Sequence, residues 1–311
     1  MSKSAFIAAG LVAASTFLFS QEPSASGVPV QVTVTVEALR GKSVPALNPQ
    51  DFIAYQERRR LQVTNVVALQ GEHAGLDLLI LLDDASASNL ANQFGALRDF
   101  ITAQPPATAI AVGYMRNGTV DTVQKFTADH DRAAQSLRLP LSFFGAMASP
   151  YLSLSDSIKH WSDQGPQGNS MRREVVLVSS GVDPLGGTGP IDPYLDSAID
   201  DAQRSGIVVY AIYSPAAGHA GHSVWRMDWG QSHLAQIGEE TGGEAYMLGF
   251  GAPVSLAPYL TEIAEHLGHQ YRVTVLTKPG NKGGFQDIRF VTEAPNAELV
   301  SANRIYVPAS R

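Results

Sequence analysis

The chain has 311 residues, of which 44% are hydrophobic and 16% are charged, and its formal net charge is −7 at pH 7. This composition allows one large or two modest domains with a sizeable core, and it excludes a disordered chain. The acidic balance argues against a general nucleic-acid binder, which needs a basic face. Because the chain has no cysteine, its stability must come from the core, without disulfides or a lipid-attachment cysteine.

The N-terminal residues have the pattern of an export signal. Lys3 supplies the positive start, and residues 5–19 are apolar but shorter than the ~20 residues that span a membrane. We expect a signal peptide at 1–20, cut between Ser20 and Ser26, and a linker at 21–29. The protein would then be periplasmic or secreted. An uncleaved membrane anchor is the alternative.

The segment 30–70 is predicted to be a small β extension. Val30–Val36 alternates strictly between apolar and polar residues, which is typical of a half-buried strand, and β-rich runs follow at 51–55 and 61–69. The basic run Arg58-Arg59-Arg60 is expected beside a hairpin turn. Such a unit would pack on the following domain and cover a sheet edge.

From 75 to 268 the pattern becomes one of alternating strands and helices, which predicts an α/β domain with a mostly parallel sheet. Strands are expected at 78–82, 109–115, 119–126, 174–178, 207–213 and 244–248, and helices at 89–103, 129–137, 152–161, 193–205, 232–241 and 254–267. Asn117-Gly118 predicts an antiparallel hairpin at one sheet edge. Residues 214–230 are expected to form a loop. A β tail at 269–311, with strands at 270–276, 285–291 and 305–308, is expected to pack on the extension.

The strongest functional motif follows the first strand of this domain. Five uninterrupted apolar residues at 78–82 predict a strand buried on both faces, and it ends at Asp83-Asp84. Ligands of α/β sheets bind at the carboxyl ends of strands, so Asp84, Ser86 and Ser88 would provide oxygen ligands for a hard cation such as Mg²⁺. The same residue types also serve as turn and N-cap residues. On the motif alone, both interpretations stay open.

The motif Asp84-x-Ser86-x-Ser88 resembles the metal-ion-dependent adhesion site of the von Willebrand factor type A domain. Further pieces resemble, in order and spacing, the von Willebrand factor A-related family of exported bacterial proteins known chiefly from acidobacteria. These pieces are the lead-in 32–47, Asp51-Phe52 with Tyr55, Thr241-Gly242-Gly243-Glu244-Ala245-Tyr246, Tyr259 with Ile263 and Gln270-Tyr271, and Tyr306-Val307-Pro308. The resemblance covers nearly everything after the signal. It implies a Rossmann-like sheet with helices on both faces and one divalent cation, which would be Mg²⁺ or else Mn²⁺ or Ca²⁺.

The resemblance also implies that three loops supply the metal ligands. Asp84, Ser86 and Ser88 match the first loop. Ser149 is the candidate for the hydroxyl of the second loop, with Ser142 as the weaker alternative.

In the third loop, Ser179-Ser180-Gly181 places Ser180 where the family has an aspartate. Losing one carboxylate weakens the attraction for a dication, although Asp83 or Asp183 could compensate through a water. The predicted site is therefore degenerate.

The function that the resemblance implies is that of a non-enzymatic, adhesion-type module. It would recognise a protein partner through the face that carries the metal, with an acidic side chain of the partner completing the coordination shell. Neither nucleic acid nor a small-molecule substrate is implied.

Two alternatives remain. A hydrolase could use Ser86 or Ser179 with His219, His222 or His233, although no G-x-S-x-G elbow exists. His219 and His222, with Asp228, also have a spacing that could bind Zn²⁺. The other alternative is a structural envelope protein with a vestigial metal site, in which an apolar patch of Trp161, Trp225, Met227 and Trp229 contacts a partner, unless these side chains pack internally.

Overall fold

The computed structural model describes residues 27–39, 43–142, 149–164, 172–186, 189–218, 223–247, 249–251, 253–278 and 282–309. The predicted signal peptide, its cleavage and most of the linker lie outside these residues, as do His219 and His222. Within the described residues, none of the helices has the length and apolar character needed to cross a membrane.

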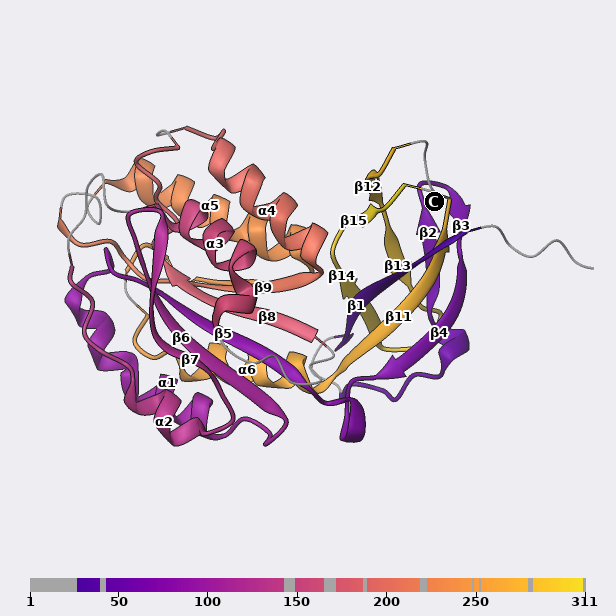
Figure 1. Cartoon of the computed structure of the whole chain (residues 1–311), viewed down its shortest axis with the longest axis horizontal. Helices are drawn as coiled ribbons and strands as arrows, with labels where there is room; N and C mark the ends of the chain where they lie inside the picture. Colours follow the sequence, from indigo (N-terminus) through magenta and orange to yellow (C-terminus); the bar gives the residue numbers. More distant parts are fainter. Residues whose placement is uncertain are drawn as a thin grey trace, which may run out of the picture.

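The larger part of the molecule is an α/β unit around a six-stranded sheet of order β10-β9-β8-β5-β6-β7 (Figure 1). All neighbouring strands are parallel except β7, which pairs antiparallel with β6 at the edge. This is the doubly wound Rossmann order with its first strand, β5, in the centre. The strands are β5 (Leu76–Asp83), β6 (Thr108–Arg116), β7 (Thr119–Thr127), β8 (Arg172–Ser179), β9 (Ile207–Tyr213) and β10 (Ala245–Tyr246).

Helices cover both faces of this sheet (Figure 1). Because every residue of β5 is buried, its side chains alternate between two cores. Leu78, Ile80 and Leu82 pack with α1 (Phe94–Thr102), α2 (His130–Gln135) and α6 (Ala257–Gly268). Leu79 and Leu81 pack with α3 (Pro150–Lys159), α4 (Pro193–Ser205) and α5 (Val224–Thr241). Burying each leucine stabilises the fold by roughly 1.5–3 kcal/mol. The predicted α/β fold class is confirmed.

The smaller part consists of strands from both ends of the chain. Its main sheet has the order β14-β1-β11-β4, and all its pairs are antiparallel. The alternating valines Val32, Val34 and Val36 of β1 turn into its core, where they pack with Val273 and Val275 of β11. The strands of this part are β1 (Val28–Ala38), β2 (Ile53–Gln56), β3 (Arg59–Arg60), β4 (Gln62–Ala68), β11 (Gln270–Thr277), β12 (Gly284–Asp287), β13 (Arg289–Val291), β14 (Ala297–Ser301) and β15 (Arg304–Val307). The division into domains at 30–70, 75–268 and 269–311 stays a prediction.

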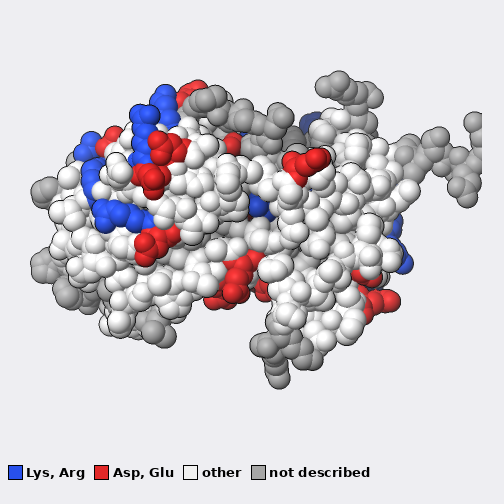
Figure 2. All heavy atoms as spheres, turned by 90° about the horizontal axis from the view of Figure 1, so that it is seen from below, with Lys and Arg blue, Asp and Glu red and all other residues white. Residues whose placement is uncertain are grey.

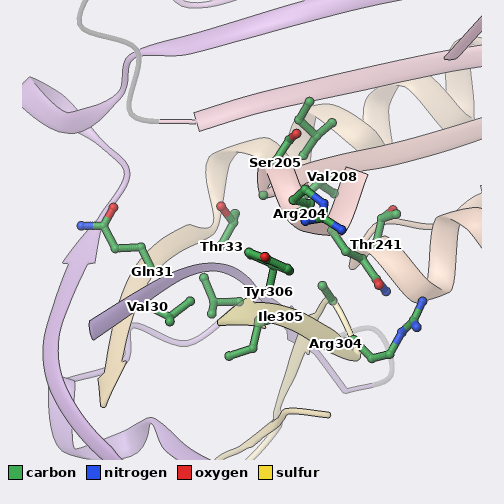
Figure 3. Close-up of a pocket in the computed structure, with 15 residues that line it drawn as sticks. Val30, Gln31, Thr33, Arg204, Ser205, Val208, Thr241, Arg304, Ile305 and Tyr306 are labelled. Atoms are coloured by element: carbon green, nitrogen blue, oxygen red, sulfur yellow. The ribbon is translucent and has the colours of Figure 1, made fainter. Parts of the chain in front are cut away.

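Polar contacts join the two parts. Arg172, at the amino end of β8, donates to the side chain of Gln270 at 2.5 Å and to the Leu267 carbonyl at 2.9 Å. A second contact borders a cavity of about 170 Å³, where the guanidinium of Arg204 lies 4.1 Å from the ring centroid of Tyr306 (Figure 3). Because the amino end of β8 faces the β part, the carboxyl ends of the parallel strands lie at the opposite end of the α/β part (Figure 1).

Two expected segments differ from the structure near this opposite end. Residues 224–230, predicted to be loop, begin helix α5, whose N-cap is Ser223 in an extended conformation. The buried face of that first stretch is Met227 and Gly230, and a glycine gives no apolar signal for a helical pattern. Residues 88–93 form a 3-10 helix before α1 instead of its first turns.

The predicted tail strand 285–291 is also wrong as a single element. It is broken at Ile288, so that β12 pairs with β15 while β13 pairs with β2. The buried Ile288 donates its N–H to the carbonyl of Asn303 at 2.8 Å, which holds the break in place. Strand β14 was not predicted.

Candidate functional site at the carboxyl edge of the sheet

The loops that follow the carboxyl ends of β5 and β9 are joined to each other. Ser86 forms an isolated antiparallel bridge with Ala216. The Ala87 N–H donates to the Pro215 carbonyl at 2.9 Å, and the Ala217 N–H donates to the Ala85 carbonyl at 2.8 Å. The backbone of the predicted metal motif is therefore held against the loop after β9. We call the edge formed by the loops after β5, β8, β9 and β10, together with the segment between α2 and α3 that contacts Asp84, the carboxyl edge.

The carboxylate of Asp84 is bound by an arginine of the same chain. Arg138 donates from Nη1 to Oδ1 at 2.7 Å and from Nη2 to Oδ2 at 2.9 Å. The Leu141 N–H also donates to Oδ1, at 3.2 Å. The Asp84 side chain is 4% exposed and that of Arg138 is 31% exposed. This two-pronged geometry is the strongest form of carboxylate–guanidinium contact.

Arg138 is fixed in position by Tyr114, a buried residue of β6. The guanidinium lies 3.7 Å from the ring centroid of Tyr114, within the range of a cation–π contact. The Tyr114 hydroxyl donates to the Arg138 carbonyl at 2.6 Å and accepts from the Arg138 N–H at 2.7 Å. Arg138 also reaches Asp121 at 3.2 Å. Its hydrogen bonds to Asp84 raise the pKa of Arg138 above its ordinary value, so it remains a permanent cation.

None of the predicted hydroxyl ligands forms a hydrogen bond with the Asp84 carboxylate among the described residues. Ser149 donates to Oδ2 of Asp183 at 2.7 Å, and the Ser180 oxygen accepts the Val182 N–H at 3.3 Å. Ser86 is fully buried, and its hydroxyl has no hydrogen-bond partner among the described residues. Ser88 is exposed at the start of the 3-10 helix. The buried hydroxyl oxygen of Ser142 likewise lacks a partner within the described part of the chain.

The carboxylates of Asp83 and Asp183 accept hydrogen bonds from nearby backbone N–H groups and serine hydroxyls. Asp83 accepts from the Ser179 hydroxyl at 2.7 Å and from the Ala85 N–H at 2.8 Å. Burial raises the pKa of Asp83 to about 6 although these hydrogen bonds lower it. Asp183 accepts from the Leu185 N–H at 2.8 Å, and burial raises its pKa too.

The third loop is closed by tight packing against α5. Gly181 has a φ of +69°, and a Cβ atom placed on Gly230 would lie 2.3 Å from the Ser180 carbonyl oxygen. Gly230 is therefore required for the close approach of helix and loop. This packing leaves Ser180 only 2% exposed.

The described donors do not fit a divalent cation at Asp84. Both carboxylate oxygens already bind a permanent cation, and a dication next to the guanidinium would be repelled. The hydroxyls of Ser149 and Ser180 are engaged within their own part of the edge, and no carboxylate stands at position 180. Metal binding by Asp84, Ser86, Ser88, Ser149 and Ser180 stays a prediction that this geometry does not favour.

Exposed apolar side chains collect on the loops of the carboxyl edge. Among the described residues, Leu39 is the single large exposed hydrophobic residue located elsewhere. Trp225, Ile191 and Val254 are 75%, 77% and 95% exposed. We call the whole set the apolar rim: Leu139 and Leu141 beside Asp84, Leu185 and Ile191 after β8, Val224 and Trp225 at the start of α5, and Phe250 and Val254 after β10.

The tryptophan patch predicted from the sequence is thus largely replaced by this rim. Trp161 is buried, with its ring centroid 5.2 Å from that of Phe126, and Met227 is buried as well. Trp229 is half-buried, so Trp225 is the exposed member of the predicted patch. The other rim residues were missed, because single apolar residues in loops give no periodic pattern.

The hydrolase hypothesis finds no serine–histidine pair in the part of the chain that the structure describes. The hydroxyl of Ser179 donates to Asp83, and that of Ser86 is unpaired. His233 is buried against Tyr151, with ring centroids 6.0 Å apart, and neither of its ring nitrogens bonds to a serine within the described residues. Burial lowers the pKa of His233, which favours the neutral imidazole.

A second group of possible metal ligands lies at the boundary between the two parts, where acidic side chains gather (Figure 2). Glu37 of β1, Glu244 before β10 and His266 of α6 bring their ligand atoms within 4.8 Å of one another. We call these three residues the junction cluster. Burial, followed by the charges of Glu244 and nearby glutamates, raises the pKa of Glu37 to about 7, while burial lowers the pKa of His266. The sequence analysis missed this group because its members come from three distant segments.

No protein-family model matches the chain, and no curated protein sequence matches it significantly. Solved structures are similar to it in part. BatB from Bacteroides thetaiotaomicron matches at a TM-score of 0.45 and 13% identity, over 62% of this chain and 97% of that protein. The ArnB paralog VWA2 from Sulfolobus acidocaldarius matches at a TM-score of 0.39 and 9% identity, over 91% and 72%.

The TRAP protein of Plasmodium vivax, solved in a manganese-loaded form, matches at a TM-score of 0.40 and 12% identity, over 80% of this chain and 96% of that protein. The manganese belongs to that protein. The strand order, the crossovers and the two helical layers described above, and not these partial similarities, define the fold of the present chain.

Proposed function

We propose that this chain is an exported, non-enzymatic binding module of the von Willebrand factor A type, which recognises a protein partner through its carboxyl edge. The observation that carries the proposal is the apolar rim. Large hydrophobic side chains from four loops are exposed at one edge of the sheet, whereas Leu39 is the single one elsewhere among the described residues. Apolar surface that is collected in one place marks a site of interaction.

The rim has features that protein interfaces use. Trp225 is the residue type that most often contributes a large share of binding energy, and it stands at the start of a helix that is packed firmly against the third loop. Beside Val254, a hollow of about 280 Å³ is lined by Leu90, Gln93 and Ser214 and could receive a side chain of the partner.

The polar groups of the edge support binding rather than catalysis. Asp84 is neutralised by Arg138, and neither Ser86 nor Ser179 bonds to a histidine among the described residues. Membership of the acidobacterial family and export to the periplasm or medium remain part of this proposal.

Site-specific photo-crosslinking tests the proposed function. A photoreactive phenylalanine analogue is placed at Ile191 in the rim, and in a control protein at Leu39, which is also exposed but follows directly after β1 in the β part. After irradiation in envelope extract, we expect one discrete adduct from position 191 and none from position 39. Excess unlabelled wild-type protein should suppress the adduct, whereas excess Trp225→Asp protein should not. Equal adducts from both positions, or equal competition by both proteins, would remove the support for this proposal.

A further inference from the structure

We propose that Arg138 permanently fills the cation position at Asp84, so that the carboxyl edge is built to work without a metal ion. The inference concerns the chain's own charges and does not depend on whether the rim has a protein partner. Its starting point is the mismatch between the predicted metal motif and the contacts that Asp84 makes.

A carboxylate that is 4% exposed needs a compensating positive charge or a proton. The Asp84 side chain receives both prongs of a guanidinium, together with the Leu141 N–H. The contact with Arg138 balances one negative charge with one positive charge. A dication beside Asp84 alone would leave one positive charge in excess, because Ser180 contributes none to offset it.

The surrounding contacts show that this pairing is part of the fold and not a chance contact of two surface residues. The backbone of Arg138 is hydrogen-bonded twice to the Tyr114 hydroxyl, and its guanidinium lies over the Tyr114 ring. The residues that follow continue around the same carboxylate, since the Ser142 N–H donates to the Asp84 carbonyl at 2.9 Å. The segment 138–142 therefore closes over Asp84 and places its cation there each time the chain folds.

Both the position and the positive charge of Arg138 act against the binding of a metal ion at Asp84. A metal ion could take the place of the guanidinium at Asp84 only after Arg138 had left both carboxylate oxygens and its position over Tyr114. Asp121, which is more exposed than Asp84, also binds Arg138 and gives a second ion pair that keeps the guanidinium in place. The edge therefore has no vacancy for a metal ion at Asp84.

The test is a titration of Mn²⁺ into the full chain, with bound Mn²⁺ read by electron paramagnetic resonance. Wild type and Asp84→Asn should give the same isotherm, because any Mn²⁺ held by the junction cluster is unaffected by Asp84. A Glu244→Gln variant identifies that contribution. A wild-type Mn²⁺ site that is absent from Asp84→Asn would overturn the proposal.

Two further variants test whether Arg138 is the excluding group. Arg138→Gln removes the charge and should gain an Asp84-dependent Mn²⁺ site, with an affinity at least ten times that of wild type at this position. Arg138→Lys keeps the charge and should gain none. Equal Mn²⁺ binding by wild type and a folded Arg138→Gln protein would contradict the proposal. If the circular dichroism spectrum shows that Arg138→Gln is unfolded, the comparison of wild type with Asp84→Asn still decides the question.

Discussion

Two groups of charges in this molecule are treated in opposite ways. At the carboxyl edge, the buried Asp84 carries its counter-charge within the chain, in the form of Arg138. In the junction cluster, the carboxylates of Glu37 and Glu244 meet the imidazole of His266, and no lysine or arginine is among the groups that shift the pKa of Glu37. Asp84 is balanced by a permanent cation, whereas Glu37 is left with a pKa near 7 and holds a proton over much of the acidic range.

This difference shows that a metal-binding motif in the sequence does not by itself identify carboxylates that lack a positive counter-charge. The motif with the metal-binding spacing contains Asp84, whose negative charge is already balanced by Arg138. The group without a permanent cation, in which His266 lies 3.7 Å from Glu37, lies where no motif is visible. Three predictions test this contrast and a fourth tests the apolar rim, and they follow in order of decreasing expected effect.

The largest effect is expected from removing the internal cation. Arg138→Ala leaves a buried carboxylate without its counter-charge, which should destabilise the fold by about 3 kcal/mol. Asp84→Asn leaves a guanidinium that is 31% exposed and can still reach Asp121, so its cost should be near 1 kcal/mol. Urea unfolding at pH 7 measures both. If both variants lost the same free energy of unfolding, the buried Asp84 would not depend on Arg138 for its stability in the folded chain.

The next largest effect on stability is expected at Glu37 of the junction cluster. The pKa of Glu37 rises from about 4.5 in the unfolded chain to about 7 in the folded one, so its stabilising contribution is complete below pH 4.5 and is lost as the pH rises through 7. Glu37→Gln should therefore raise the stability at pH 8 by about 1 kcal/mol, after allowance for the solvent exposure of the carboxyl group, and leave it nearly unchanged at pH 4.

The buried Asp83 and Glu174 have pKa values raised to about 6 and about 7, and they titrate in the same range. The measurement for Glu37 is therefore the difference between wild type and variant across the pH series, in which these two contributions cancel. A difference that is the same at pH 4 and pH 8 would show that the charge of Glu37 is compensated by groups other than those described.

A smaller shift should follow from the neighbour of Glu37. Glu244→Gln removes the like charge that raises the pKa of Glu37 most, so it should lower that pKa toward its ordinary value by less than roughly one unit. A ¹³C NMR titration of the glutamate carboxyl groups measures this shift. As a matched control, Glu72→Gln changes a glutamate of the 3-10 helix Gly71–His73, which does not contribute to the raised pKa of Glu37, and it should leave that resonance unmoved.

The smallest effect on stability is expected at the apolar rim. Trp225 is 75% exposed, so Trp225→Ala should change the free energy of unfolding by no more than about 0.5 kcal/mol, while it removes the photo-adduct at position 191. Thermal unfolding and the crosslinking assay give the two values. A large loss of stability would mean that Trp225 serves the fold and not a partner.

The fold could be read from the sequence where local patterns decide it. The uninterrupted apolar run at 78–82 identified the central strand, and Asn117-Gly118 identified the edge hairpin. The pairing of Asp84 with Arg138 could not be read in this way, because the two residues are 54 positions apart and no spacing rule connects them. The start of α5 was missed for a different reason, since Gly230 is buried for close packing and not for its apolar character.

The candidate site shows the same limit. The sequence located the carboxyl edge correctly, because the end of a buried parallel strand fixes where its loop lies. Which hydroxyl faces which carboxylate depends on the loop conformations after β5 and β8, as in the bond from Ser149 to Asp183. The junction cluster required both ends of the chain to be placed in space, with Glu37 on β1 and His266 on α6.

The most direct measurement is X-ray diffraction from crystals of the wild-type protein soaked in Mn²⁺, with data collected at the manganese absorption edge. We expect no anomalous peak within bonding distance of the Asp84 oxygens, and the guanidinium of Arg138 should still bind both of them. An anomalous peak at Asp84, with Arg138 displaced from Tyr114, would contradict the claim that the chain supplies its own cation.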